Sequence, residues 1–359
     1  MRLKKYFTPV LICILGCMLL VAGCGESESK KEPESETVTV TVTDSAGRSV
    51  ELPQPLERVV ILNTDVAEAM RILKVQDKVI GVSDTIQKDP YLDLQDKDLI
   101  GKWNTPNYEK IIELKPQVVI SYSRTPGPVL SEKLEPTGIK VVYLDLFKPE
   151  TYNSDLKTLG KMFGKEKEAS SFIKWKEDKI AILECLNDIK SEQKPKVFGM
   201  WASNFQKEQW KTFATGTSVH QGIEMAGGIN VAREMENYPE VSPEWILQQN
   251  PSAVIMAIAD KNELGFGATS LSSVEKLQES VINHKVFAKT VAGKEKRVYM
   301  ISTSMLGGDK TYLGALYLAK WFYPDKFKDL DPDKVLKEYF EKWLDVPFQG
   351  KWAYPPSSQ

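Results

Sequence analysis

The sequence predicts an α/β protein with two lobes joined by one long, rigid helical segment. Strand and helix patterns alternate at short intervals over residues 38–150 and again over residues 195–359, which is typical of parallel α/β layers. Residues 151–194, between them, are rich in Lys, Glu, Ala, Ile and Leu and show helical spacing with a break near Gly164. With 359 residues, 42% of them hydrophobic, the chain can build a core in each lobe.

The N-terminal segment is expected to precede the folded body. Basic residues followed by an apolar run over residues 7–22 indicate a signal peptide over residues 1–23. The run is short for a membrane span, although an uncleaved anchor helix is the alternative. Residues 21–24 resemble the lipobox of exported lipoproteins, which implies cleavage and lipidation at Cys24. Residues 24–37 lack apolar side chains to bury, so we expect a flexible tether there.

The first lobe is expected to begin with a β-hairpin, because Thr and Val alternate over residues 37–43 and can pair with residues 49–52 across a turn at residues 44–47. Short apolar strands are then predicted over residues 58–62, 79–82, 118–121 and 140–144, with helices over residues 65–73, 108–114 and 129–134. This alternation favours a parallel sheet covered by helices.

The second lobe repeats the alternation and ends in helices. Strands are predicted over residues 196–200, 253–258 and 297–301, and helices over residues 218–225, 243–249, 272–281, 312–322 and 332–344. Residues 109–120 and 244–255 share a frame of Glu, an aliphatic pair, Pro at the eighth place and a final Val-Ile. Each is a short helix, a proline stop and a buried strand, so the repeat favours two similar lobes over one continuous sheet.

Composition excludes several kinds of chemistry. The formal net charge is −2 and the sequence has no basic run, so nucleic acid is not an expected partner. With two histidines, the chain cannot form a three-histidine zinc site. We find no nucleophile elbow, phosphate-binding loop or dinucleotide-binding fingerprint, and therefore predict no catalytic residue, metal or cofactor.

Several short segments, in a fixed order over most of residues 38–345, carry a more specific resemblance. They include Thr43-Asp44-Ser45-Ala46-Gly47-Arg48-Ser49-Val50, Pro55-Leu56-Glu57-Arg58-Val59-Val60, Asn107-Tyr108-Glu109-Lys110-Ile111, Gly138-Ile139-Lys140-Val141-Val142, Leu159-Gly160-Lys161-Met162-Phe163-Gly164, Gly227-Gly228-Ile229-Asn230-Val231-Ala232 and Val241-Ser242-Pro243-Glu244. The chain thereby resembles the substrate-binding lipoproteins of ABC importers for iron complexes (siderophores) and vitamin B12. The resemblance implies the class III periplasmic-binding fold and a membrane-anchored receptor, outside the cell membrane, that delivers a bulky ligand to a permease dimer and its ATPase.

Candidate ligand contacts lie in loops that follow strand ends, where open α/β sheets bind ligands. They are Trp103, Tyr122, Arg124, Trp201, Tyr238 and Met305. The resemblance places Trp103 and Tyr238 at aromatic positions of B12-binding members, and Arg124 near an arginine of iron-complex binders. A guanidinium suits carboxylate or hydroxamate oxygens, because its planar fork makes paired charge-assisted hydrogen bonds. The alternative for Trp103 is packing in a half-exposed loop and for Arg124 a solvated loop charge, whereas for Trp201, Tyr238 and Met305 it is packing in the core.

The resemblance also implies two docking carboxylates, one on the outer face of each lobe, that meet arginines of the permease. Glu68 and Glu224 match these positions, and each lies in a predicted helix between small or apolar residues. Two fixed carboxylates would set orientation and association rate more than affinity. The alternative for each is an ordinary charge on a helix surface.

The identity of the ligand stays open at this level. Arg124 favours an anionic ferric siderophore, whereas Trp103 and Tyr238 favour a corrinoid, and haem is a further alternative. From other classes of protein, an exported chelate-processing enzyme would need a reactive acid or nucleophile in the cleft, and a tethered sensor or adhesin would need an exposed binding surface.

Overall fold

A computed structural model describes residues 38–259 and 263–356. The predicted signal peptide, Cys24 and the predicted tether lie outside the described residues. Residues Val38–Gln359 form one compact unit. Across the described residues, no helix is both long enough and apolar enough to cross a membrane.

The first lobe is built on a five-stranded parallel sheet in the order β5-β4-β3-β8-β9. Its strands are β3 (Val59–Ile61), β4 (Val79–Val82), β5 (Asp98–Leu99), β8 (Val118–Ser121) and β9 (Lys140–Tyr143). Two antiparallel hairpins accompany it, β1 (Thr39–Thr43) with β2 (Ser49–Pro53) and β6 (Gly101–Lys102) with β7 (Thr105–Pro106). The helices are α1 (Thr64–Ile72), α2 (Asp84–Gln87), α3 (Tyr108–Leu114) and α4 (Pro128–Leu134), with 3-10 turns over Gln76–Lys78 and Glu135–Thr137.

The second lobe has its own five-stranded sheet in the order β11-β10-β12-β13-β14, parallel except for the edge strand β14. The strands are β10 (Lys196–Trp201), β11 (Ile229–Asn230), β12 (Ala253–Ile258), β13 (Val298–Ser302) and β14 (Ala353–Tyr354). The helices are α7 (Ala202–Phe205), α8 (Ser218–Met225), α9 (Pro243–Gln249), α10 (Ser272–Ile282), α11 (Val291–Lys294), α12 (Thr311–Phe322) and α13 (Pro332–Glu338), which continues as the π-helix η8 (Tyr339–Trp343). The 3-10 turns are Phe287–Lys289, η6 (Thr303–Leu306) and η7 (Gly308–Lys310).

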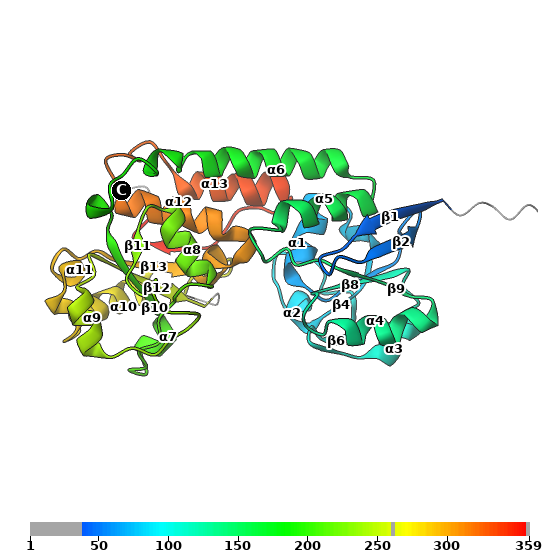
Figure 1. Ribbon diagram of the computed structural model, residues 1–359, viewed down its shortest axis with the longest axis horizontal. Coiled ribbons are helices and arrows are strands. Elements are labelled where there is room, and N and C mark those ends of the chain that lie inside the picture. The colour runs from blue at the N-terminus through cyan, green and yellow to red at the C-terminus, as the bar shows by residue number, and fades with distance from the viewer. Residues whose placement is uncertain (1–37, 260–262, 357–359) are drawn as a thin grey trace, which may run out of the picture. The chain divides into compact units, whose positions relative to one another are not determined.

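The connector between the lobes is helical, as predicted. It consists of α5 (Tyr152–Met162) and α6 (Glu166–Ala181), followed by 3-10 turns over Glu184–Leu186 and Ser191–Gln193. The break between the helices falls at Gly164, whose φ of 63° suits glycine. Helix α6 lies beside α13 (Figure 1), and Lys179 forms a 2.9 Å ion pair with Glu338 between these two helices. The predicted architecture of two α/β lobes and a long connecting helix is confirmed.

The internal repeat corresponds to two matching local structures, α3 followed by β8 and α9 followed by β12. The side chains of Asn107 and Ser242 cap the two helices by accepting hydrogen bonds from backbone N–H groups. At the other end, Lys115 and Asn250 adopt the left-handed conformation, with φ of 48° and 45°, and a proline follows each. The same start and stop signals thus produce the same helix-to-strand unit in both lobes.

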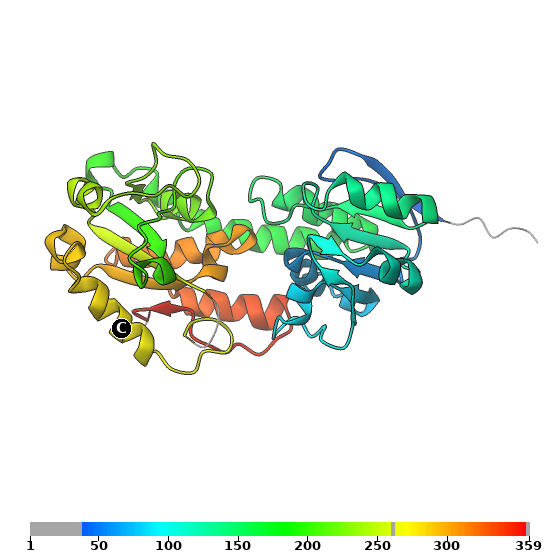
Figure 2. The ribbon, with the colours of Figure 1, turned by 90° about the horizontal axis from the view of Figure 1, so that it is seen from below.

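A hydrophobic core runs from one lobe into the other. Its largest cluster includes Met70 of α1, Phe172 of α6 and Leu316 of α12. Each lobe has a second, smaller cluster, which includes Val119 of β8 in the first lobe and Met256 of β12 in the second. In Figure 2 the two sheets lie in separate lobes, with helices passing between them. The shared core indicates that the lobes are packed together rather than loosely tethered.

Candidate ligand-binding site

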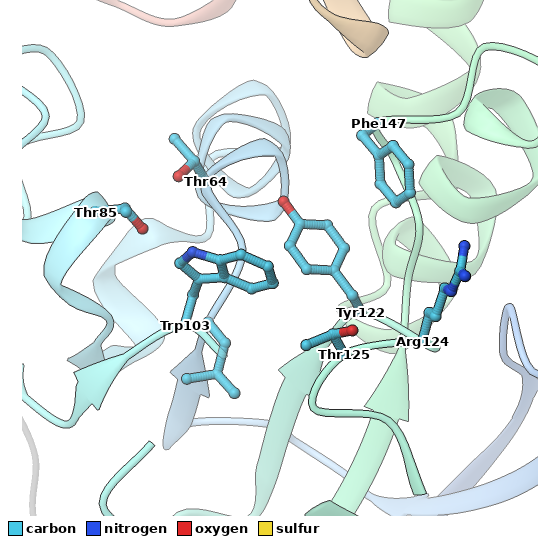
Figure 3. A pocket seen from close by; sticks show the side chains of 8 residues that line it. Thr64, Thr85, Trp103, Tyr122, Arg124, Thr125 and Phe147 are labelled. Atoms are coloured by element: carbon cyan, nitrogen blue, oxygen red, sulfur yellow. The ribbon is translucent and has the colours of Figure 1, made fainter. Parts of the chain in front are cut away.

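A pocket of about 380 Å³ opens at one end of the first lobe's sheet. It is lined by Leu62, Thr64, Thr85, Trp103, Tyr122, Arg124, Thr125 and Phe147 (Figure 3). Three of the six predicted ligand contacts, namely Trp103, Tyr122 and Arg124, are therefore neighbours in one pocket. Its volume is within the range of small-molecule sites.

The topology of the sheet explains why these residues meet. Thr64 follows β3, Thr85 follows β4, Tyr122 follows β8 and Phe147 follows β9, so all four lie beyond the carboxyl ends of parallel strands. The chain leaves β3 toward β4 on one side, while β8 lies on the other side of β3. Such a switch point leaves a crevice between the strand ends, and ligands bind there in open α/β sheets.

Tyr122 is the centre of an aromatic cluster in this pocket. Its ring packs edge-on against Trp103, with 5.7 Å between ring centroids, and against Phe147, at 5.3 Å. Figure 3 shows the Tyr122 ring between the other two, with its hydroxyl directed toward α1. The hydroxyl donates a 2.7 Å hydrogen bond to Oδ1 of Asp65. Burial, together with the Asp65 carboxylate, raises the pKa of Tyr122, so the phenol stays protonated.

Asp65 lies behind the pocket, on the first turn of α1. It is 8% exposed, and its second carboxylate oxygen, Oδ2, is buried with no hydrogen-bond partner among the described residues. Burial raises the pKa of Asp65 to about 7, although the hydrogen bond from Tyr122 acts in the opposite direction. The carboxyl group therefore titrates near neutral pH.

Arg124 supplies a positive charge at the edge of the pocket. Its side chain is exposed and makes no hydrogen bond or ion pair with any residue that the structure describes. Phe147, 42% exposed, lies beside it in Figure 3. A free guanidinium next to aromatic rings can bind a carboxylate, catecholate or hydroxamate oxygen while the rings cover the apolar part of a ligand.

The second lobe contributes its own aromatic cluster. Trp201, at the end of β10, lies 5.1 Å from Tyr238 and 4.2 Å from Phe213 between ring centroids. Tyr238 is 54% exposed and lines a pocket of about 230 Å³ that Phe147 of the first lobe also lines. Two predicted contacts, Trp201 and Tyr238, are thus brought together, and Tyr238 faces the first lobe across this pocket.

A larger pocket of about 610 Å³ lies between the lobes and continues the first one, because both include Thr64 and Thr85. From the first lobe it is lined by Thr64, Glu68, Thr85, Lys88, Asp89, Pro90 and Tyr91, and from the second by Phe266, Gly267, Thr303, Ser304 and Lys310. A cleft between the lobes is therefore present, with an aromatic end near Trp103 and a polar end near Lys310.

Met305 does not lie in this cleft. The turn η6 directs it inward, its side chain is 0% exposed, and it belongs to the main hydrophobic core. The prediction that Met305 covers a ligand is wrong, because its apolar side chain is already used in packing. Its neighbours Thr303 and Ser304 line the polar end of the cleft instead.

The structure also buries Glu68, which the sequence predicts to be on the surface. It is 2% exposed and accepts hydrogen bonds from Lys310 Nζ at 2.7 and 2.8 Å, from Tyr339 at 2.7 Å and from Tyr91. The prediction that Glu68 lies on an outer face is wrong, since its small and apolar neighbours reflect burial at the lobe junction. Glu224, in contrast, is exposed on α8, where it accepts a 3.3 Å hydrogen bond from the Asn230 backbone.

Several residues at the cleft are absent from the sequence prediction, among them the lining residues Thr64, Thr85 and Phe147 and, behind the pocket, Asp65. Phe147 comes three residues after a predicted strand, so the strand-end rule that selected Tyr122 could have found it. Asp65 and the two threonines carry no comparable signal, because a polar residue at a helix start is most often a capping or solvated group. No group of three or more His, Cys, Asp or Glu side chains in the described parts of the chain could hold a metal ion.

The fold and the cleft define a two-lobed binding protein. The chain belongs to the periplasmic binding protein family, whose sequence pattern matches residues 59–304. Members of this family are binding proteins of ABC transporters, so the chain is a solute-binding protein and not an enzyme, and the enzyme alternative is set aside. The predicted class III fold is confirmed by the solved structures that the chain resembles.

Relatives with several different ligands match the chain. The molybdate-binding protein MolA of Haemophilus influenzae is 22% identical over 340 residues, which cover 85% of this chain and 91% of that protein. A vitamin B12-binding protein of Salmonella typhimurium is 28% identical over 204 residues, which cover 56% of this chain and 72% of that protein. Among solved structures, the TroA-like periplasmic binding protein FepB of Veillonella parvula has a TM-score of 0.74 and 24% identity, covering 88% of this chain and 99% of that one.

Proposed function

We propose that this protein captures an anionic iron chelate in the cleft between its lobes and delivers it to an ABC permease. The observation that carries this proposal is the free guanidinium of Arg124 in a pocket walled by three aromatic rings. A positive group without an intramolecular partner is available to a ligand anion, and the rings provide the apolar contact area that a bulky chelate needs.

A corrinoid is the second candidate. It is supported by the aromatic residues on both sides of the cleft, with Trp103 and Phe147 in the first lobe and Tyr238 in the second. Such surfaces suit a large ring system with little charge. Proteins named as vitamin B12-binding are also among the relatives, although they align with little more than half of this chain.

Tryptophan fluorescence distinguishes these ligands. The tryptophan emission of a protein comprising residues 25–359 is recorded during titration with a ferric tris-catecholate, a ferric tris-hydroxamate, cobalamin, haem and molybdate. We expect an anionic ferric chelate to quench the emission at micromolar concentration, and Trp103→Phe to lose most of that quenching. Trp210→Phe is the matched control, because Trp210 packs against His284 and Phe287 rather than in the cleft. Quenching by cobalamin alone would favour the corrinoid, and no quenching by any of the five would contradict the proposal.

Delivery to the membrane completes the proposed function. The lipobox-like residues 21–24 support an acyl anchor on Cys24, and Cys24→Ser should then release the protein from the membrane fraction. Glu224, exposed on α8, supports a docking role for this face of the second lobe. Glu224→Ala should reduce uptake of the ligand and leave binding unchanged, whereas Glu234→Ala, at another exposed site, should change neither.

A further inference from the structure

The hydrogen bond between Tyr122 and Asp65 restricts what the cleft can bind. Figure 3 shows the Tyr122 ring inside the pocket with its hydroxyl directed toward α1, and Asp65, which accepts its hydrogen bond, is not among the lining residues. The hydroxyl donates a 2.7 Å hydrogen bond to Oδ1 of Asp65. To coordinate a metal, Tyr122 would have to break this hydrogen bond, turn its oxygen toward the ligand and lose its phenolic proton. The Asp65 carboxylate opposes this loss, because it raises the pKa of the phenol.

Asp65 itself is out of reach of the ligand. It does not line the pocket, it is 8% exposed, and it meets the site through Tyr122. Its Oδ2 is buried and has no hydrogen-bond partner among the described residues, which is costly for a carboxylate that serves only to hold a helix end. A buried carboxylate that holds the site's central side chain through one oxygen and leaves the other without a partner indicates a role in binding.

We infer that Asp65 is a positioning residue of the cleft. Its carboxylate fixes the Tyr122 hydroxyl as a neutral hydrogen-bond donor directed toward Asp65 and away from the ligand. The site is thereby adapted to a complete anionic chelate rather than to a metal ion with open coordination positions. This inference builds on the proposed function, because it names which class of iron ligand the same site accepts. Trp103, Phe147 and Arg124 then contact the outside of a chelate whose own oxygens already saturate the metal.

The negative charge of Asp65 has a second consequence. Asp309 and Lys310 of η7 face it from the other lobe, and Glu68 follows one turn later on α1. Within this group Lys310 is already paired with Glu68 and Asp309, at 2.7 and 2.9 Å. An anionic ligand beside Tyr122 therefore meets a carboxylate that is not neutralised, and ligand binding should draw a proton onto Asp65.

The decisive variant is Asp65→Asn, which keeps an oxygen acceptor for Tyr122 and removes the charge. Dissociation constants are measured by fluorescence quenching between pH 6 and 8 with a hexadentate ferric tris-catecholate. For the wild-type protein, affinity should fall about three- to tenfold as the pH rises, because Asp65 ionises. In Asp65→Asn the profile should be flat and the binding at pH 8 tighter. Asp77→Asn, a change to an exposed acid outside the cleft, should keep the wild-type profile.

Spectroscopy tests the role of Tyr122 separately. In difference spectra of the wild-type protein, neither ferric ion alone nor the bound chelate should show a tyrosinate-to-iron charge-transfer band beyond the chelate's own absorption. Such a band, if lost in Tyr122→Phe, would overturn the inference. So would an unchanged pH profile in Asp65→Asn while the wild-type protein binds the chelate normally. If the wild-type protein binds no anionic chelate at all, the proposed function itself fails, and this outcome is distinct from the other two.

Discussion

Lys310 of the second lobe inserts its ammonium group between both carboxylate oxygens of Glu68 in the first lobe, at 2.8 Å from Oε1 and 2.7 Å from Oε2. Tyr339, from η8, donates to the same carboxylate at 2.7 Å, and Arg71, one turn further along α1, donates to the Leu344 carbonyl at 2.9 Å. One face of α1 is thereby fastened to two separate segments of the second lobe. The lobes are joined by this buried network as well as by α6.

Removing one member of the buried pair should destabilise the protein strongly. Burial alone would raise the pKa of Glu68, but Lys310 and two tyrosine hydroxyls hold it below its usual value. Glu68→Ala leaves the Lys310 charge buried with reduced compensation, which should cost about 3–5 kcal/mol in the free energy of unfolding. Urea denaturation measures the loss.

The matched control for this prediction is Glu57→Ala, which breaks an exposed 2.6 Å pair with Lys78 and should leave the free energy of unfolding nearly unchanged. The double variant Glu68→Gln with Lys310→Met should recover part of the lost stability. A cost for Glu68→Ala no larger than that of the control would contradict the role of the network.

Asp65 should make stability depend on pH. Its pKa is raised to about 7 in the folded protein from an ordinary value of 3.8, so the folded state binds more protons between these values. Stability should therefore increase as the pH falls from 8 toward 5, and the contribution from Asp65 should vanish in Asp65→Asn. We expect this variant to be more stable than wild type at pH 8 by about 1–3 kcal/mol, as measured by thermal unfolding across the pH range. A wild-type-like pH slope in the variant would refute the assignment.

Phe147 should contribute to binding and little to stability. It is 42% exposed and packs edge-on against Tyr122 at the mouth of the pocket. Phe147→Ala should weaken ligand binding about tenfold, since the contact area of the ring is lost and aromatic ring contacts contribute about 0.5–1.5 kcal/mol beyond the area they cover. Its unfolding free energy should change by less than about 1 kcal/mol. Val129→Ala, at a site 46% exposed on α4, should affect neither quantity, and an equal effect of both substitutions on binding would argue against the site.

Arg124 should discriminate anionic from neutral ligands. Arg124→Gln should raise the dissociation constant of an anionic chelate about 10- to 100-fold, because a charge-assisted hydrogen bond contributes about 1.5–3 kcal/mol. Arg124→Lys should recover only part of the loss, since a lysine cannot make the paired contacts of a guanidinium. Titration at low and high salt measures the electrostatic share, and Arg233→Gln on the exposed surface is the control. Equal binding by Arg124→Gln and wild type would contradict the proposed ligand class.

Local signals were sufficient for much of the fold. The Thr-Val alternation before residue 44 predicted the first hairpin, and the repeated helix-Pro-strand frame predicted the α3-β8 and α9-β12 units. The strands of two residues, such as β5, β11 and β14, were not predicted, because two residues cannot show a period. The strand-end rule likewise selected Tyr122 and Arg124, since parallel strands expose their carboxyl ends at one edge.

The same local reasoning failed where a side chain's environment comes from distant segments. Glu68 and Glu224 have similar neighbours in sequence, yet one is 2% exposed and the other lies on the surface. The difference arises from Lys310 and Tyr339, which are more than 240 residues away from Glu68 in the chain. Met305 became a core residue because the turn after β13 folds against the second lobe's interior.

By itself, the sequence determined the two α/β lobes, the helical connector with its break at Gly164 and the aromatic character of the cleft, because these depend on periodicity, on caps and on residue type. Only the tertiary structure decided which charges are buried, which carboxylate pairs with Lys310 and how Asp65 holds Tyr122. The physical reason is that burial and hydrogen-bond partners are set by contacts between elements far apart in the chain, and no local pattern encodes them.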